Sequence, residues 1–234
     1  MNIYRRFFLC ATAVAAVMLL GSCATINRLD RYSIEDESLM AHMRMPPGPT
    51  VDIDYSVWVD SKNPIGTALK VGTTILKASE AEKAQAVMME ALSSVDVPAI
   101  VLDETSKGFA SALEAQLVDR GQNADYLLDL DIEQYGIQAP SWASAVSLHL
   151  RLTPSLYHNR DGKIVWRRKN ITVDVPASPQ MFGAEQIVSD IVTAAVLSTL
   201  TVEQLEEGFR LLALESARAV ISRLEQDFYR ARYR

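Results

Sequence analysis

The chain has 234 residues, of which 49% are hydrophobic and 22% charged, with 29 acidic against 23 basic residues and a net charge of −6. This length fits one domain with an extension, and an acidic chain without a basic block argues against nucleic-acid binding. The two cysteines are too few for a disulfide scaffold or a cysteine-rich metal site.

The amino terminus has the three parts of an export signal. Arg5 and Arg6 precede an uncharged apolar run of 14 residues, 7–20. The run matches the core of a signal peptide and is shorter than the roughly 20 residues that a membrane-spanning helix needs. It ends in Leu20, Gly21, Ser22 and Cys23, with small residues where a peptidase needs room. An uncleaved signal anchor with a chance cysteine is the alternative.

This segment resembles the lipobox of bacterial lipoproteins. The resemblance implies that signal peptidase II removes residues 1–22 and that Cys23 carries diacylglyceride and palmitate-type acyl chains. Such chains contribute about 0.8 kcal/mol per buried CH₂ and hold a protein at the membrane. Ala24 follows the cysteine, where an Asp tends to mark inner-membrane retention in the family. The resemblance therefore implies an outer-membrane lipoprotein that faces the periplasm.

The next segment, residues 23–50 with the lipidated cysteine, is predicted to be a tether to a single domain over residues 51–234. Ser33 is a suitable cap for a short helix to about Arg44. The prolines at positions 46, 47 and 49 would stop that helix. A coil of this length reaches roughly 30 Å, so the domain is expected to stand off the membrane.

The first half of the domain is predicted to alternate strands and helices. Apolar residues at every second position predict a strand over 51–59, and Asn63-Pro64 is typical of a helix start. The predicted elements are a strand over 51–59, helices over 64–78 and 79–94, a short strand over 97–102 and a helix from Asp103 or Thr105 to Gly121.

The second half is predicted to contain three consecutive antiparallel strands followed by helices. Period-two patterns begin near residues 125, 146 and 163, and the third pattern changes parity near 167–170, which a bulge would explain. Thr201 and Gln204 form a capping box for a final amphipathic helix. The sequence therefore predicts an α+β two-layer domain, a mixed sheet with helices packed on one face.

Three short segments carry a further resemblance: residues 124–128, 161–166 and 217–221. Over about 96–228 the chain resembles small periplasmic lipoproteins with a TolB-amino-terminal-like domain. It is also similar to the auxiliary lipoproteins of ABC-type lipid transporters. The resemblance implies binding to other envelope components rather than catalysis, and it places no partner-binding residue.

The sequence contains no recognised catalytic motif. His42, His149 and His158 lack metal-ligand spacing, and the sequence predicts no metal and no cofactor. Asp129, Asp131 and Glu133 share one strand face, either as a cation or acid–base site or as a solvated face paired across strands. We favour the second interpretation, with partners drawn from His149, Arg151, Arg167 and Lys169.

Two other features are candidates for binding. In residues 65–76, small residues would allow close approach of a partner helix or of the membrane surface, and the candidate partner-binding residues are Ile65, Leu69, Gly72 and Leu76. A buried helix of the same domain is the alternative there, and also for the apolar segment 187–200. The carboxyl-terminal Arg230, Arg232 and Arg234 place positive charge at a helix end, which suits the helix dipole. Contact with anionic lipid or peptidoglycan is their second interpretation.

These observations predict a lipid-anchored, periplasm-facing envelope protein. Its expected role is non-enzymatic, as a binding or scaffold component of an envelope transport or assembly system with a protein partner. One alternative is an envelope hydrolase that uses the strand carboxylates Asp129 and Asp131. The other is a purely structural lipoprotein that forms a homo-oligomer through its apolar helices.

Overall fold

The computed structural model describes residues 25–44, 50–53, 57–58, 68–71, 74–120, 122–139, 145–182, 196 and 199–233, with the backbone alone over residues 50–85. The predicted signal peptide and Cys23 lie outside the described residues, as do residues 140–144 and most of segment 187–200.

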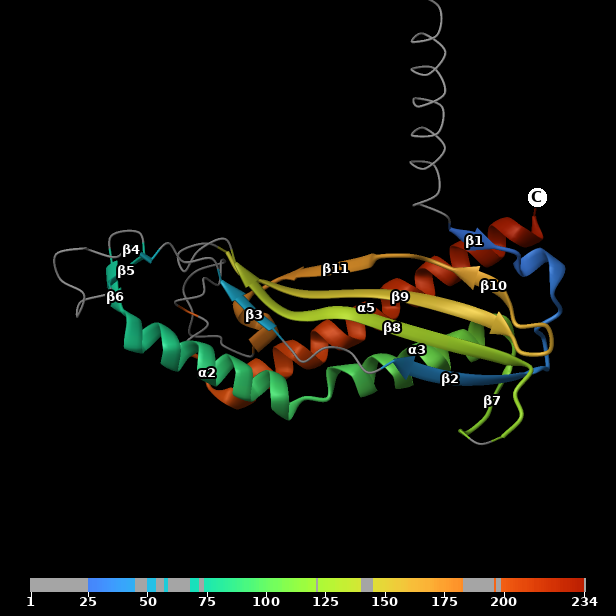
Figure 1. Cartoon of the computed structure of the whole chain (residues 1–234), viewed down its shortest axis with the longest axis horizontal. Coiled ribbons are helices and arrows are strands. Elements are labelled where there is room, and N and C mark those ends of the chain that lie inside the picture. Colours follow the sequence, from blue (N-terminus) through green and yellow to red (C-terminus); the bar gives the residue numbers. More distant parts are fainter. Residues whose placement is uncertain are drawn as a thin grey trace, which may run out of the picture.

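A long antiparallel hairpin forms the centre of the main sheet (Figure 1). Its strands are β8 (Tyr126–Ala139) and β9 (Ser147–His158), which alternate apolar and polar residues as the sequence predicts. Two shorter strands pair along each outer edge of the hairpin. β2 (Ser38–Arg44) and β3 (Thr50–Ile53) run parallel to β8, and β10 (Lys163–Arg167) and β11 (Ile171–Pro176) run antiparallel to β9.

Short strands extend the sheet at both edges. β1 (Ile26–Asn27) pairs with β10, and β7 (Gln116–Leu117) pairs with β2. A separate three-stranded sheet contains β4 (Val57–Trp58), β5 (Ala68–Val71) and β6 (Thr74–Lys77).

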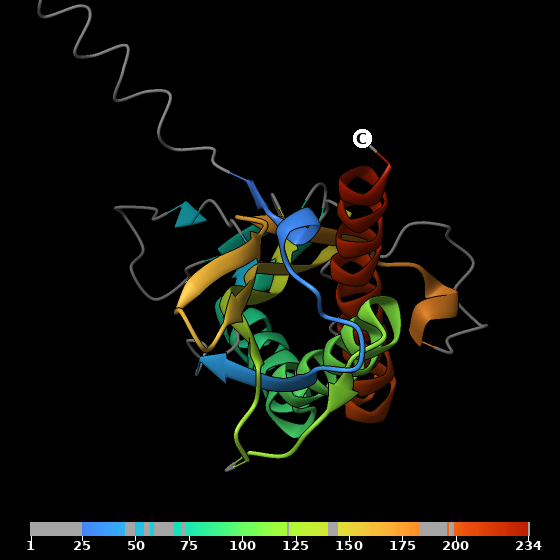
Figure 2. The same cartoon turned by 90° about the vertical axis from the view of Figure 1, so that its right-hand side faces the viewer.

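Three helices cover one face of the main sheet: α2 (Ala78–Ser94), α3 (Val97–Leu113) and α5 (Val202–Arg232) (Figure 2). Two single-turn helices, η1 (Leu29–Arg31) and η2 (Pro179–Phe182), complete the described elements. The core lies between sheet and helices, where Phe109 of α3 meets Trp166 of β10 edge to face at 5.5 Å. The predicted α+β two-layer architecture is confirmed.

The start of α5 follows the predicted chemistry. The Oγ1 of Thr201 accepts a hydrogen bond from the backbone N–H of Gln204 at 3.3 Å, and the Gln204 side chain accepts one from the Thr201 N–H at 3.0 Å. The helix buries Leu205, Phe209 and Leu212 against the sheet. The predicted helix over 79–94 is confirmed as α2, in which Met88, Ala91 and Leu92 are buried.

The predicted tether over residues 23–50 is wrong for the described part from Ile26 to Arg44, which belongs to the folded domain. β2 takes the place of the expected helix and pairs with β8 from Leu39–Tyr126 to Arg44–Asp131. Leu39 and Met43 are buried, because alternate residues of this segment face the helices. The Tyr126 hydroxyl donates to the Ser33 carbonyl at 2.9 Å, and burial raises the pKa of this phenol to about 12.

The predicted helix over residues 64–78 is also wrong where the structure describes it. Residues 68–71 and 74–77 form the β5–β6 hairpin, with Leu69 opposite Leu76. Two glycines and several β-branched residues lower helix propensity here, and a hairpin is compatible with both. Of the candidate partner-binding residues, Ile65 and Gly72 lie outside the described part of the chain.

The boundaries around α3 correct two further expectations. Residues 97–102 are the first turns of this helix and not a strand, because the Asp96 side chain accepts a hydrogen bond from the Ala99 N–H at 3.0 Å and Pro98 occupies the first turn. The helix ends well before Gly121, since Glu114 has a left-handed conformation with φ of 55°. Leu117, within the range predicted to be helical, lies in β7 and is 46% exposed.

No helix in the described part of the chain combines the length and apolarity that a membrane crossing requires.

Candidate functional site

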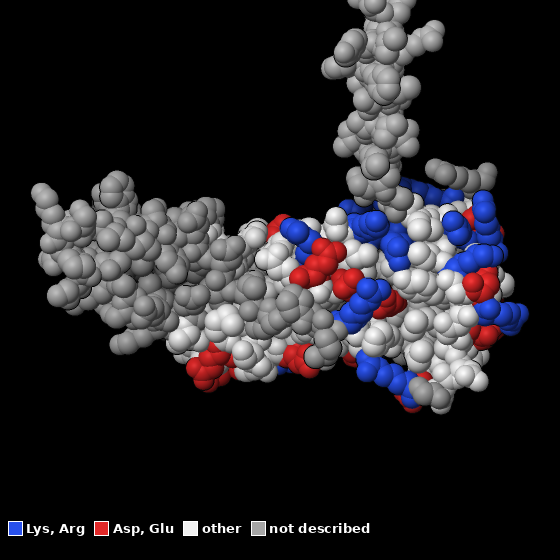
Figure 3. Space-filling view, viewed as in Figure 1, with Lys and Arg blue, Asp and Glu red and all other residues white. Residues whose placement is uncertain are grey.

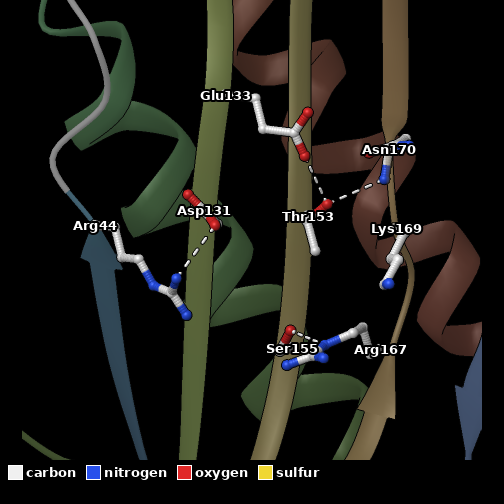
Figure 4. A pocket seen from close by; sticks show the side chains of 8 residues that line it. All are labelled: Arg44, Asp131, Glu133, Thr153, Ser155, Arg167, Lys169 and Asn170. Atoms are coloured by element: carbon white, nitrogen blue, oxygen red, sulfur yellow. Dashed lines mark hydrogen bonds and ion pairs between the residues drawn. The ribbon is translucent and has the colours of Figure 1, made fainter. Parts of the chain in front are cut away.

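A polar groove lies on the outer face of the sheet, the face opposite to the helices (Figure 4). Its volume is about 270 Å³. β2, β8, β9 and the β10–β11 connection contribute its lining residues: Arg44, Asp131, Glu133, Thr153, Ser155, Arg167, Lys169 and Asn170. Basic and acidic side chains lie next to one another over β8 and β9 in the space-filling view (Figure 3).

One arginine organises the acidic side of this groove. The Nη2 and Nε atoms of Arg44 donate to the Oδ2 of Asp129 at 2.7 and 3.1 Å, and its Nη1 lies 3.4 Å from the Oδ2 of Asp131. The hydrogen bond to Asp129, followed by the charges of both carboxylates, raises the pKa of Arg44. The parallel pairing of β2 with β8 creates this contact, since it places Arg44 opposite Asp131.

Asp129 is the most buried acid of the groove region, with 9% of its side chain exposed. Its Oδ1 is buried and accepts no hydrogen bond from the described residues. A buried carboxylate oxygen without a donor costs about 1–3 kcal/mol relative to a satisfied one.

The opposite wall of the groove is basic. Arg167 donates to the Ser155 hydroxyl at 2.8 Å and to the Tyr157 hydroxyl at 2.7 Å, so its guanidinium is held in one orientation. Lys169 is exposed and makes no ion pair with any described residue. Between the walls, Thr153 donates to Glu133 at 2.9 Å and accepts from the Asn170 N–H at 3.0 Å.

The period-two pattern correctly places Asp129, Asp131 and Glu133 on one face, but the predicted partners are wrong. The main cation is Arg44, from the segment predicted to be a tether, while His149 is buried and pairs with Asp174 of β11 at 2.8 Å. The sequence contains no local signal for Arg44, because the pairing that brings it to Asp129 spans 85 residues.

This arrangement suits binding of a polar or charged partner. The groove presents donors from Arg167, which two hydroxyl groups hold in place, acceptors from Asp131 and Glu133, and the exposed cation of Lys169. Both candidate catalytic carboxylates, Asp129 and Asp131, lie within ion-pair distance of the same guanidinium. Among the described residues, no group of three His, Cys, Asp or Glu side chains forms a metal-ligand set.

We expect Arg44→Ala to lower the free energy of unfolding by about 1–3 kcal/mol, because it leaves the buried Asp129 carboxylate without its hydrogen-bond donor. Urea unfolding of wild type and variant measures this. Lys107→Ala is the control: its ion pair with Asp103 lies on the surface of α3, so little change is expected. An Arg44→Ala variant as stable as Lys107→Ala would contradict the assignment of β2 to the domain.

Comparison with known proteins gives structural likeness only. No family model and no curated protein matches the sequence. Protein XCC0632 from Xanthomonas campestris, of family DUF330, is 14% identical with a TM-score of 0.37, over 83% of this chain and 89% of that chain. A predicted lipoprotein from Caulobacter crescentus is 16% identical with a TM-score of 0.29, over 55% and 83% of the two chains. The PelC dodecamer from Paraburkholderia phytofirmans is 12% identical with a TM-score of 0.27, over 80% and 91%. The α+β assignment therefore rests on this chain's own sheet and helices.

Proposed function

We propose that the chain is a lipid-anchored envelope protein that faces the periplasm from the outer membrane and binds a partner without catalysing a reaction. The observation that carries this proposal is the lipobox-like segment ending at Cys23, which directly precedes the folded domain. Ile26 already belongs to the sheet through β1. The proposed anchor is thus joined to the domain by two residues instead of a long tether.

The groove supports a binding role. A retaining or inverting glycoside hydrolase needs one carboxylic acid that can donate a proton and a second carboxylate near it. Here Asp129 and Asp131 share the cation of Arg44, and Asp129 is nearly buried. We therefore place partner binding on the outer face of the sheet, in an envelope transport or assembly system.

Processing of the amino terminus tests the anchor. With Cys23 intact, mass spectrometry should find a mature chain that begins at a diacylglyceryl-modified Cys23. Cys23→Ser should leave the chain unprocessed and longer by its 22-residue signal, because signal peptidase II cuts only after lipidation. Cys10→Ser is the matched control and should be processed normally. If the wild-type chain and both variants all retain residues 1–22, the chain keeps an uncleaved signal anchor and the proposal fails.

The binding role is tested by crosslinking in the envelope. A partner captured by the wild type should be lost with Arg167→Glu/Lys169→Glu, which reverses the basic wall of the groove, and kept with Lys107→Glu on the helix face. Asp129→Asn/Asp131→Asn separates the roles: a hydrolase would lose its activity completely while still binding. A mass measurement of the unlipidated chain that shows a large homo-oligomer with no other partner would favour the structural alternative.

A further inference from the structure

At the end of the domain next to the proposed anchor, hydrogen bonds join the amino-terminal residues to the last turns of α5. The described chain enters at Thr25, and the carboxyl-terminal turns of α5 lie beside this entry point (Figure 1). Arg168 links the two, since it donates to the Thr25 hydroxyl at 3.2 Å and to Asp227 of α5 at 2.7 Å. Asn27 of β1 also donates to the Asp227 carbonyl at 2.9 Å. Amino-terminal entry and helix end are therefore one fixed surface.

Positive charge gathers on this surface. Figure 3 shows several Lys and Arg side chains at this end, with Asp and Glu side chains between some of them. A hollow of about 320 Å³ between η1 and α5 contains Arg31 and Arg230 together with two carboxylates, Asp30 and Asp227. Asp227 is buried and pairs with Arg168 at 2.5 Å and, more distantly, with the exposed Arg230 at 3.9 Å. In a chain with a net charge of −6, this concentration of exposed arginines favours an anionic partner.

Aromatic side chains accompany the arginines. Tyr229 and Tyr233 are 65% and 74% exposed, and they are two of the three large apolar side chains that the described residues expose. Their rings lie 4.6 Å apart, so they form one patch. The Arg232 guanidinium lies 4.4 Å from the centre of the Phe228 ring. Exposed Tyr beside Arg is typical of protein surfaces at the headgroup level of a bilayer.

The short link between Cys23 and β1 limits how far the domain can lie from the proposed anchor. Three residue steps separate Cys23 from Ile26, and an extended chain spans at most about 3.6 Å per step. Ile26, where the chain enters the sheet, is then within roughly 11 Å of the lipidated residue, close to the screening length of about 8 Å at physiological salt. Arg28 and Arg31, both exposed, follow Ile26 by two and five residues and are the arginines nearest to the proposed anchor along the chain.

We propose that the anchor-proximal surface, defined by Arg28, Arg31, Tyr229, Arg230, Arg232 and Tyr233, binds anionic phospholipid headgroups and orients the domain on the membrane. This inference deepens the proposed function and rests on its anchor. Lipid anchoring alone leaves the domain free to rotate about the link, whereas a second contact on α5 fixes its long axis relative to the bilayer. The groove then has a defined orientation toward a partner.

Vesicle sedimentation of the unlipidated mature chain, residues 23–234 with Cys23→Ser, tests this surface apart from the anchor. Binding is expected to vesicles of phosphatidylcholine mixed with phosphatidylglycerol, not to phosphatidylcholine alone, and to weaken with salt. Arg230→Glu/Arg232→Glu should weaken binding at least about tenfold, since each change replaces an attraction to the anionic surface with a repulsion. Tyr229→Ser/Tyr233→Ser should weaken it at low and high salt alike.

The control makes the same change of charge elsewhere on the same helix. Arg210→Glu/Arg218→Glu lies away from the anchor, at exposed positions, and should leave vesicle binding unchanged. Circular dichroism checks that all variants are folded. Equal losses in both pairs, binding to peptidoglycan but not vesicles, or no vesicle binding would overturn the inference. Because the anchor is tested by Cys23 processing, a failure here leaves that proposal standing, and the reverse also holds.

Discussion

Asp227→Ala is expected to destabilise the domain by about 3–5 kcal/mol, the largest effect of any single change considered for this chain. Asp227 is 3% exposed and accepts hydrogen bonds from Arg168 at 2.7 and 2.5 Å and from the Trp166 indole N–H at 2.9 Å. Its removal leaves a guanidinium and an indole donor without their acceptor inside the protein. Urea unfolding followed by circular dichroism gives the difference.

The controls separate charge from packing. Glu225→Ala, an exposed position on the same helix, should change stability little. Asp227→Asn keeps the shape and still leaves the Arg168 charge unpaired, so most of the loss should remain. Replacing the pair together, by Arg168→Met/Asp227→Leu, should recover stability, because an apolar pair avoids the cost of burying two charges. A stable Asp227→Ala protein would show that this network is not formed.

Gly208→Val is expected to cost about 2–3 kcal/mol through overpacking between α5 and η2. A Cβ at Gly208 would lie 2.2 Å from Cε1 and 2.7 Å from Cδ1 of Phe182. The Phe182 ring is 1% exposed, so the surrounding core prevents it from moving away. The gain in helix propensity over glycine, below about 1 kcal/mol, does not offset this clash.

A rescue experiment identifies the clash as the cause. Phe182→Ala alone removes core volume and should also destabilise, but the Gly208→Val/Phe182→Ala double variant should lose less than the sum of the two. Arg210→Val, on the exposed side of the same turn, is the control for propensity. Additive losses in the double variant would mean that Gly208 matters for a reason other than its contact with Phe182.

The parts of the fold that the sequence predicts correctly are those with local signals. The alternation of Leu128, Leu130 and Ile132 identifies β8, and the capping box at Thr201 marks the start of α5. The change of parity after Trp166 corresponds to the break between β10 and β11, where Asn170 has a φ of 53°. In each case neighbouring residues contain the whole signal.

The errors occur where distant pairing decides the structure. Residues 38–44 form a strand because they pair with β8, and no local sequence feature predicts that pairing. Pro98 is compatible with both an edge strand and the first turn of a helix. The hydrogen bond from the Ala99 N–H to the Asp96 side chain favours the helix. The sequence predicts only the acidic side of the groove for the same reason. Its acids follow one another along a single strand, whereas Arg44 is far from them in the sequence.

The parallel pairing of β2 with β8 also sets the order in which the domain can form. Ser38 contacts Asp125 across 87 residues, so β2 cannot pair until the central hairpin has been synthesised. Contacts between such distant residues close late and slow folding. An exported chain delivers its amino terminus first, so the segment nearest the proposed lipid waits longest for its partner. We therefore expect β2 to wait for β8 and β1 to wait for β10 before they join the sheet, while the proposed lipid would already hold the chain at the membrane.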